Sequence, residues 1–384
     1  MTGTDQWARA TAGLAAPLVA VDLDAFDANA DDLVQRAGGL PIRVASKSVR
    51  CRTLLDRVLA RPGFAGVMSY AVPEAVWLVG AGLRDVFVAY PSVDEAALRA
   101  VATGDLLRAE VTLTIDSVEH VRWLRDTLGA DLAGVGVALD CDASLRVGRV
   151  HLGVRRSPTR GAEQALAVVR AALGVGLDVR GVMFYDAQVA GLPDAGPHIR
   201  TMKRRSVREL GERRAAVVTA VRAETDLRFV NAGGTGSLHR FGGDRVVTEL
   251  AAGSGLYGPT LFDGYDDFTP RAAMAFALPV VRRPGPGYVT AFGGGYVASG
   301  EPGWSRVPSP VQRGLKLVRT EATGEVQTPL HGDDADGLRI GDRVWLRGAK
   351  AGELLERFDT VHLVAGGELV GTVPSYRGEG RNFG

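Results

Sequence analysis

Along most of the chain, short apolar runs alternate with longer segments in which apolar positions recur every three or four residues. The short runs are rich in valine and aromatic residues, which is typical of buried strands. The longer segments have the length and period of helices, as in 73–82, 117–128, 161–175 and 200–224. Eight such strand and helix units in succession predict a parallel (β/α)8 barrel. The predicted barrel strands are 42–47, 64–69, 85–90, 110–115, 134–140, 179–184, 228–231 and 246–251.

The strand and helix rhythm ends after Asp263. Residues 276–384 carry short β-like runs separated by Gly, Pro and Asp, which predicts a second, mostly β domain. An alternating run at 17–24, followed by a helix at 25–38, precedes the barrel and is expected to join the β domain. We therefore expect the α/β class, a TIM-type barrel followed by a mostly β C-terminal domain. The expected boundaries are 1–40 for the N-terminal strand and helix, 41–265 for the barrel and 266–384 for the β domain.

The charge balance and the cysteine content limit the class of protein. Lysine and arginine total 45 against 44 aspartate and glutamate residues, which argues against nucleic acid or an anionic membrane as the main partner. No apolar run is long enough to span a bilayer, and the N-terminus lacks the features of a signal peptide. Cys51 and Cys141 are too few for a disulfide framework. We expect a cytoplasmic protein.

Lys47 stands at the end of the first predicted barrel strand, between Ser46 and Ser48. Barrel enzymes take catalytic residues from the carboxyl ends of their strands, and a lysine there can form a Schiff base. An ordinary surface lysine is the alternative interpretation. Gly-rich segments follow the seventh and eighth strands, at 231–237 and 252–257, where such barrels frequently bind phosphate. A ligand that needs both an amine and a phosphate site is pyridoxal 5'-phosphate (PLP).

The order of these motifs resembles the alanine-racemase-like fold of PLP enzymes, and within it the D-threonine aldolase and D-serine dehydratase group. The resemblance covers nearly the whole chain and is specific at VASKS (44–48), GVMFYDAQ (181–188), NAGGTGS (231–237), ELAAGSGLYGPTLFD (249–263) and IGDRV (340–344). It implies that Lys47 carries PLP as a Schiff base and that Tyr185 acts beside it. The other cofactor-binding residues that it implies are Arg146, Gln188, Asn231, Gly233, Gly234, Thr235, Ser254, Gly255 and Tyr257.

The sequence departs from this group where its metal-dependent members carry ligands. Those members have an acidic-acidic-His-Gly run in the β domain, and the aligned residues 325–328 contain no histidine. Lys350 and Gly352 take the positions of two further ligands, and a protonated lysine and a glycine cannot coordinate zinc or manganese. The group's histidine shortly after the Schiff-base lysine is also absent, because Val49 follows Ser48. We expect no metal site.

Aldol cleavage requires a base that takes the proton of the β-hydroxyl group. Lys350, Glu353, Tyr376 and Arg377 are candidates only by their region of the β domain, where an ordinary surface or interface residue is the commoner case. His198, in the loop after the sixth barrel strand, is a candidate for contact with the substrate, and His239, after the Gly-rich segment, is a candidate to face the cofactor.

We therefore expect a PLP-dependent lyase that cleaves or forms a β-hydroxy-α-amino acid, of D configuration, by aldol chemistry. Elimination of water, as in an amino acid deaminase (dehydratase), and racemisation stay open. PLP activates whichever bond at Cα lies perpendicular to its ring. A PLP carrier without turnover is the non-enzyme alternative, and the large β domain argues against it. The resemblance also implies a homodimer.

Overall fold

The computed structural model describes residues 3–384. The chain forms two compact units that are interleaved along the sequence. The domain boundaries predicted at residues 40 and 265 stay a prediction. The barrel unit consists of Leu33–Lys47, Leu59–Gly253 and Phe383–Gly384, and the sheet unit of the chain up to Asp32, Ser48–Val58 and Ser254–Asn382.

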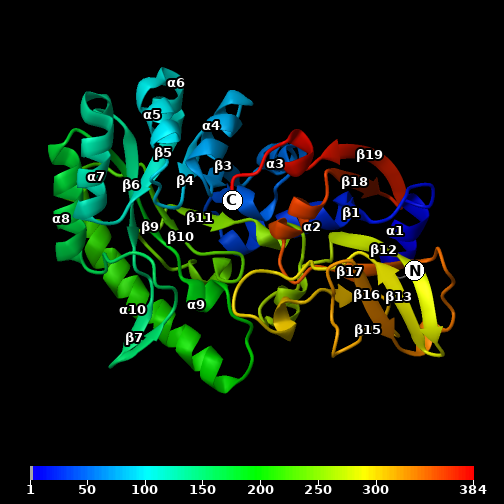
Figure 1. The fold of residues 1–384 in the computed structure, drawn as a ribbon. Helices are drawn as coiled ribbons and strands as arrows, with labels where there is room; N and C mark the ends of the chain where they lie inside the picture. The colour runs from blue at the N-terminus through cyan, green and yellow to red at the C-terminus, as the bar shows by residue number, and fades with distance from the viewer. Residues whose placement is uncertain (1–2) are drawn as a thin grey trace. The chain divides into compact units, whose positions relative to one another are not determined.

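The barrel unit contains a closed barrel in the strand order β10, β11, β2, β3, β4, β5, β6 and β9 (Figure 1). Each strand pairs in parallel with its neighbours, and Leu250 opposite Ile42 joins the last strand to the first. The predicted barrel is therefore confirmed, with all eight predicted strands present. The strands are β2 Ile42–Ala45, β3 Phe64–Ser69, β4 Val86–Val88, β5 Val111–Ile115, β6 Gly136–Cys141, β9 Asp178–Phe184, β10 Phe229–Ala232 and β11 Glu249–Ala252.

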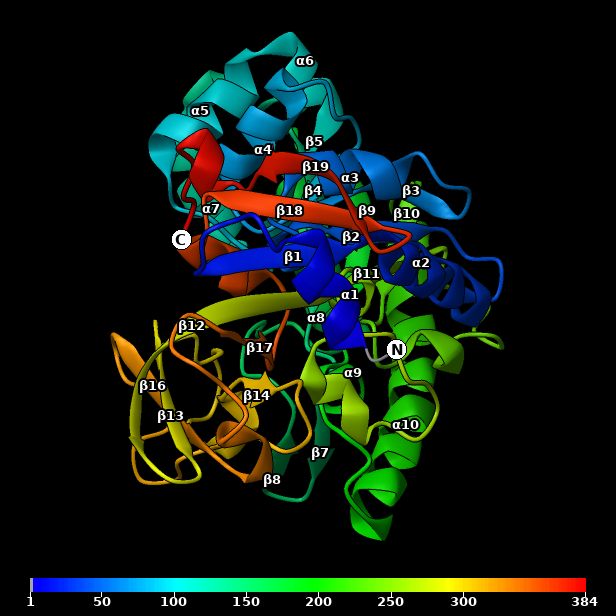
Figure 2. The same ribbon diagram turned by 90° about the vertical axis from the view of Figure 1, so that its right-hand side faces the viewer.

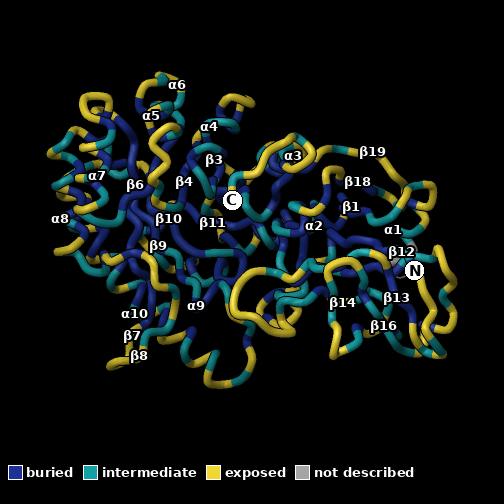
Figure 3. Tube along the Cα trace, viewed as in Figure 1, coloured by how far each residue is buried: buried dark blue, intermediate teal, exposed yellow. Residues whose placement is uncertain are grey.

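Most residues of the barrel strands are buried because both faces of the strands are covered, and these strands are largely dark blue in Figure 3. Side chains from several strands fill the barrel interior in one cluster. A hairpin of β7 Leu145–Val147 and β8 Val150–Leu152 interrupts the rhythm between β6 and β9. The interior cluster consists of Phe87, Ala89, Ala138, Met183 and Phe229.

Helices connect the barrel strands, and α7, α8 and α10 pack side by side on the outside of the barrel (Figure 1). Two of the helices begin at capping side chains: Asp94 accepts from the Ala97 N–H at 3.1 Å, and Ser117 accepts from the His120 N–H at 3.2 Å. No helix within residues 3–384 combines the length and apolar character needed to cross a membrane. The helices are α1 Gly3–Ala10, α2 Leu23–Ala37, α3 Arg52–Leu59, α4 Val72–Gly80, α5 Glu95–Thr103, α6 Asp105–Glu110, α7 Val118–Leu128, α8 Ala162–Gly174, α9 Ala187–Ala190 and α10 Pro197–Arg222.

The sheet unit is built on strand β1, Leu18–Asp22, which lies between β12 and β18 (Figure 2). β1 pairs antiparallel with β12 and parallel with β18. Trp7 and Trp345 pack against this sheet with ring centroids 5.6 Å apart, as part of a buried cluster. The other strands are β12 Met274–Gly285, β13 Tyr288–Phe292, β14 Ser309–Pro310, β15 Lys316–Leu317, β16 Gln327–His331, β17 Arg343–Arg347, β18 Thr360–Ala365 and β19 Glu368–Pro374.

Candidate active site

Lys47 lies where strand β2 ends and a short 3-10 turn, Ser46–Ser48, begins. The Ser46 hydroxyl donates to the Met68 carbonyl at 3.1 Å and so ties this turn to the neighbouring strand β3. The half-buried Lys47 amine donates to the Tyr90 hydroxyl at 2.6 Å. Because all barrel strands are parallel, Lys47 stands at the carboxyl end of the barrel, where barrel enzymes place their chemistry.

The chain has only four lysines, and their surroundings differ. Lys203 is buried in an ion pair with Asp194 at 2.8 Å. Lys316 is exposed on β15, and Lys350 contacts the Ser299 hydroxyl at 3.4 Å in the sheet unit. Only Lys47 stands at the end of a barrel strand, which makes it the lysine suited to covalent chemistry.

Two tyrosines and an arginine lie around Lys47. Tyr90 follows β4, Tyr185 follows β9, and Arg156 comes from the segment between β8 and α8. The Arg156 guanidinium carbon lies 5.5 Å from the ring centroid of Tyr90 and 5.2 Å from that of Tyr185, so the cation contacts both rings. Within residues 3–384, Arg156 forms no salt bridge with a carboxylate. The guanidinium is thus able to take an anionic group of a ligand.

The two tyrosines differ in acidity. Burial would raise the pKa of Tyr90, but the charges of Lys47 and Arg156 outweigh it and the pKa is lowered. Burial dominates at Tyr185 and raises its pKa in spite of the same two cations. Tyr185 therefore stays a protonated hydrogen-bond donor, whereas Tyr90 is the more acidic phenol.

Two buried carboxyl groups at the same barrel end hold protons more tightly than usual. Asp140 lies one residue before the end of β6, and burial together with the charge of Asp116 raises its pKa to about 7. Asp186 follows Tyr185, and burial raises its pKa to about 7 even though the Ser237 hydroxyl donates to it at 3.2 Å. Carboxyl groups with such pKa values can exchange protons near neutral pH.

The Gly-rich segment after β10 lies against Tyr185. Gly233 has φ +78°, and a Cβ on Gly234 would lie 2.9 Å from the Ala190 Cβ and 3.5 Å from the Tyr185 ring. The Gly234 N–H donates to the Ser237 hydroxyl at 3.2 Å. Glycine is required here because any side chain would fill the space beside the backbone.

The segment after β10 also holds Thr235, whose carbonyl accepts from Arg36 at 2.7 Å. Asn231, on β10 itself, donates to the Glu249 carboxylate at 2.8 Å inside the barrel. The roles predicted for Gly233, Thr235 and Asn231 in cofactor binding stay predictions.

Gln188 lies on α9 and is almost fully buried. Its amide nitrogen donates to the Ala143 carbonyl at 2.7 Å. Its oxygen has no hydrogen-bond partner among the described residues, and it lies beside Gly153, where a Cβ would approach to 2.8 Å. A buried acceptor without a donor is costly, so it fits a site that a ligand completes.

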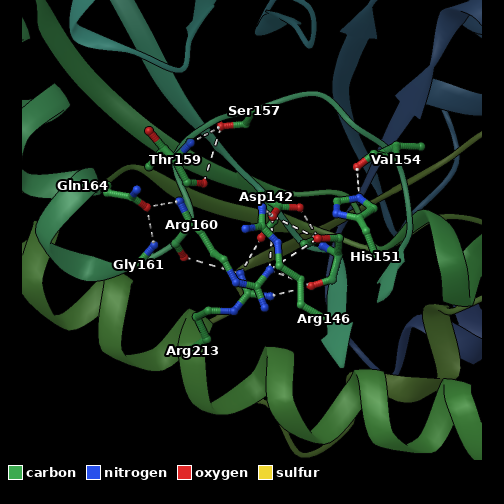
Figure 4. A network of polar contacts seen from close by, with 12 residues as sticks. Asp142, Arg146, His151, Val154, Ser157, Thr159, Arg160, Gly161, Gln164 and Arg213 are labelled. Carbon is green, nitrogen blue, oxygen red and sulfur yellow. Dashed lines mark hydrogen bonds and ion pairs between the residues drawn. The ribbon is translucent and has the colours of Figure 1, made fainter. Parts of the chain in front are cut away.

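Arg146 belongs to a separate polar network, which Figure 4 shows. Its guanidinium, on a half-exposed side chain, pairs with the Asp142 carboxylate at 2.8 Å, and Arg160 pairs with the same carboxylate at 3.1 Å. The Ser144 N–H also donates to Asp142, at 2.9 Å. The expected role of Arg146 toward the cofactor stays a prediction, while Arg156 is the arginine that contacts Tyr90 and Tyr185.

The remaining predicted cofactor residues belong to the sheet unit. Ser254 and Gly255 form a 3-10 turn, Ser254–Leu256, directly after β11 in the chain. Tyr257 is fully buried, and its hydroxyl donates to the Val49 carbonyl at 2.7 Å. Burial raises its pKa well above the usual range. The roles predicted for Ser254, Gly255 and Tyr257 stay predictions.

The predicted substrate residues lie in several places. His198 is exposed in the first turn of α10. In the sheet unit, the Glu353 carboxylate accepts from both the N–H (2.7 Å) and the hydroxyl of Ser299, which Lys350 also contacts. Tyr376 is almost fully buried. Within residues 3–384, no group of three or more His, Cys, Asp or Glu side chains is placed to hold a metal ion.

Sequence reasoning missed Tyr90, Arg156 and Asp140. Tyr90 stands two residues after β4 and Asp140 near the end of β6, so the rule that drew attention to Lys47 applies to both. Arg156 lies in an irregular segment beyond a hairpin, where no periodic pattern shows which way a side chain points.

Residues 21–260 match the family model described as the alanine racemase N-terminal domain. The chain belongs to this family. A search of curated proteins finds no match for the sequence. The resemblance inferred from the sequence motifs is therefore confirmed, and so is the cofactor, because the alanine racemase family consists of PLP enzymes.

Solved structures of other proteins share the fold along most of the chain. D-threonine aldolase from Filomicrobium marinum superposes with a TM-score of 0.80 at 22% identity, covering 95% of this chain and 96% of that one. D-threo-3-hydroxyaspartate dehydratase from Delftia sp. HT23 gives 0.74 at 18% identity, with 94% and 98% covered. Alanine racemase from Clostridium difficile 630 gives 0.63 at 13% identity, with 94% and 99% covered. At these identities the likeness is one of fold.

The barrel unit fits PLP on its own residues. Lys47 offers the amine, and Gly233 and Gly234 keep the backbone without side chains beside Tyr185. The unpaired oxygen of Gln188 marks a place for a ligand donor. The residues that the structure brings together at the carboxyl end of the barrel are therefore suited to this cofactor.

Proposed function

We propose that the chain is a PLP-dependent lyase that cleaves or forms the Cα–Cβ bond of a β-hydroxy-α-amino acid of D configuration. The observation that carries the proposal is the Lys47 amine at the carboxyl end of the barrel, hydrogen-bonded to Tyr90, whose ring also contacts Arg156. The fold shared with D-threonine aldolase supports the reaction class.

In this proposal Lys47 holds the cofactor through its amine and later moves the proton at the substrate's Cα. When bound, PLP supplies the electron sink for the bond that breaks at Cα. Arg156 binds the substrate carboxylate, since it forms no salt bridge with another residue in the described part of the chain. Tyr185, kept protonated by burial, donates a hydrogen bond to the bound ligand.

The base for the β-hydroxyl proton is proposed among Glu353, Lys350 and Tyr376. In the sheet unit, the Glu353 carboxylate accepts hydrogen bonds from the N–H and the hydroxyl of Ser299. We further propose that the protein is a cytoplasmic homodimer, on the grounds of its two free cysteines and its family.

A dehydratase is the second candidate, supported by the fold shared with D-threo-3-hydroxyaspartate dehydratase. Both reactions begin with the same substrate class and differ in which bond at Cα or Cβ breaks. Racemisation and cofactor binding without turnover are further outcomes that the same assays distinguish.

The first test concerns the cofactor. Purified protein is expected to show an absorbance band of lysine-bound PLP that disappears on borohydride reduction, with the reduced adduct on Lys47 by peptide mass mapping. Lys47→Ala should lose the band, whereas Lys316→Ala, at an exposed lysine of a β-domain strand, should keep it. Absence of the absorbance band, or an adduct on another lysine, would contradict the proposal.

The second test identifies the reaction. D-threonine-like and D-serine-like β-hydroxy amino acids and their L enantiomers are incubated with the enzyme and assayed for aldehyde, keto acid and loss of optical rotation. Aldehyde and glycine from the D substrates support the lyase. Keto acid with ammonia points to the dehydratase, loss of rotation alone to a racemase, and no product at all to a carrier.

A further inference from the structure

Tyr90 packs beside Lys47. Its ring lies against the buried barrel cluster that includes Phe87 and Met183, and it stands two residues after β4. The hydroxyl thereby reaches the Lys47 amine at 2.6 Å without relying on a long flexible loop. A short hydrogen bond between an amine and a phenol is a path for a proton.

The chemistry of Lys47 creates a need for such a path. An aliphatic amine is protonated at neutral pH and then has no lone pair with which to attack an aldehyde. A phenolate beside the ammonium group can take its proton: the N–H bond breaks, an O–H bond forms, and the products are a phenol and a neutral amine. No other reactant is needed, and the reverse transfer restores the starting pair.

We propose that Tyr90 is a catalytic residue that accepts the proton of Lys47 and so frees the lysine amine for bonding to the cofactor. The proposal rests on the function proposed above, because it requires Lys47 to be the cofactor lysine. The neighbouring Tyr185 is less suited to accept this proton, because its pKa is raised and its phenol stays protonated.

The charges facing Tyr90 favour this role. Lys47 approaches from the end of β2 and Arg156 from the segment before α8, and together they lower the pKa of Tyr90 against the effect of burial. Tyr185 faces the same two cations from the end of β9. Asp140, on β6, lies near Arg156 and partly offsets its charge.

The first experiment measures tyrosine ionisation directly in the full-length protein freed of PLP. In a spectrophotometric titration, the wild type should show one phenol that ionises at lower pH than the rest. Tyr90→Phe should lose this step and keep the ring that packs on the barrel core. The control Tyr288→Phe, at an exposed tyrosine of β13, should retain it.

Removal of the neighbouring cation gives a second variant. Arg156 is exposed to solvent, so Arg156→Gln is expected to fold. In this variant the step that belongs to Tyr90 should move to higher pH. A step that does not move, or one that survives in Tyr90→Phe, would show that Tyr90 is not the acidic phenol.

The second experiment measures how fast the PLP-free protein binds added PLP to Lys47, across a range of pH. At neutral pH, Tyr90→Phe should react about 100-fold more slowly than the wild type. The deficit should vanish at high pH, where the amine loses its proton to solvent. A constant deficit at every pH would indicate a purely structural role and would overturn the inference.

The outcomes separate this inference from the proposed function. If the wild type forms no adduct at Lys47, the proposed function fails. If the wild type and Tyr90→Phe bind PLP at equal rates at every pH, only the role of Tyr90 fails.

Discussion

A charged pair inside the barrel provides the sharpest stability prediction. Arg43 of β2 is 2% exposed, and its guanidinium donates to the Glu249 carboxylate of β11 at 2.7 and 2.8 Å. Asn231 donates to the same carboxylate at 2.8 Å. Burial alone would lower the pKa of Arg43, but Glu249 outweighs it and the pKa is raised. Glu249→Gln removes the charge while it keeps the shape of the side chain.

The cost follows from what remains around Arg43. Loss of one partner of a buried pair costs about 3–5 kcal/mol. Asp85 still contacts Arg43 at 3.0 Å, but its carboxylate is 60% exposed. We therefore expect the lower end, about 3 kcal/mol, for Glu249→Gln. The matched control Asp85→Asn removes the exposed partner of the same arginine and should cost at most about 1 kcal/mol.

Hydrogen exchange read by mass spectrometry reports this loss where it occurs. Peptides covering β2, β10 and β11 should exchange about 100-fold faster in Glu249→Gln than in the wild type. Their exchange rates should be nearly unchanged in Asp85→Asn. Equal effects of the two variants, or none in Glu249→Gln, would refute the view that burial decides the strength of this pair.

Three further predictions concern the candidate site. Gly234→Ala places a Cβ 2.9 Å from the Ala190 Cβ and should raise the Kd for PLP about tenfold or more, whereas Gly242→Ala, which meets nothing within 4 Å, should leave it unchanged. The pKa of Asp186 is raised from 3.8 to about 7 by burial, so its contribution to stability is fully present below about pH 4 and is lost as pH rises to about 7. The stability of the wild type relative to Asp186→Asn should therefore fall by up to about 4 kcal/mol over that range in denaturant titrations, and Asp226→Asn, at an exposed carboxylate, should show no such trend. Treatment with a chelator should leave the activity unchanged. A loss of activity would show that the enzyme requires a metal and would contradict this prediction.

Local patterns were sufficient for the strands and for Lys47. The apolar runs of the barrel are buried on both faces, so their composition and spacing alone locate each strand to within a few residues. The parallel arrangement then assigns every residue after a strand to the same end of the barrel. This rule alone predicts that Lys47 and the segment at Gly234 lie at the carboxyl end of the barrel.

Such local patterns do not predict contacts between residues that are far apart in the chain. The Arg43 and Glu249 pair forms only because β11 closes the barrel against β2, more than two hundred residues away in the chain. Burial of opposite charges in an otherwise apolar interior leaves no periodic signal. In the same way, the sequence does not show that Tyr185 and Tyr90 differ in acidity, because that difference depends on which cations lie near each ring.

What the sequence by itself determined is the barrel and the cofactor, since these depend on hydrophobic period, strand ends and local motifs. That Lys47 holds the cofactor stays a prediction. Only the tertiary structure decided the neighbours of that lysine. Arg146 lies on the hairpin strand β7 and pairs with Asp142, whereas Arg156, ten residues later in an irregular segment, contacts Tyr90 and Tyr185. The physical reason is that side-chain directions in irregular segments are set by packing against distant strands, which no local pattern records.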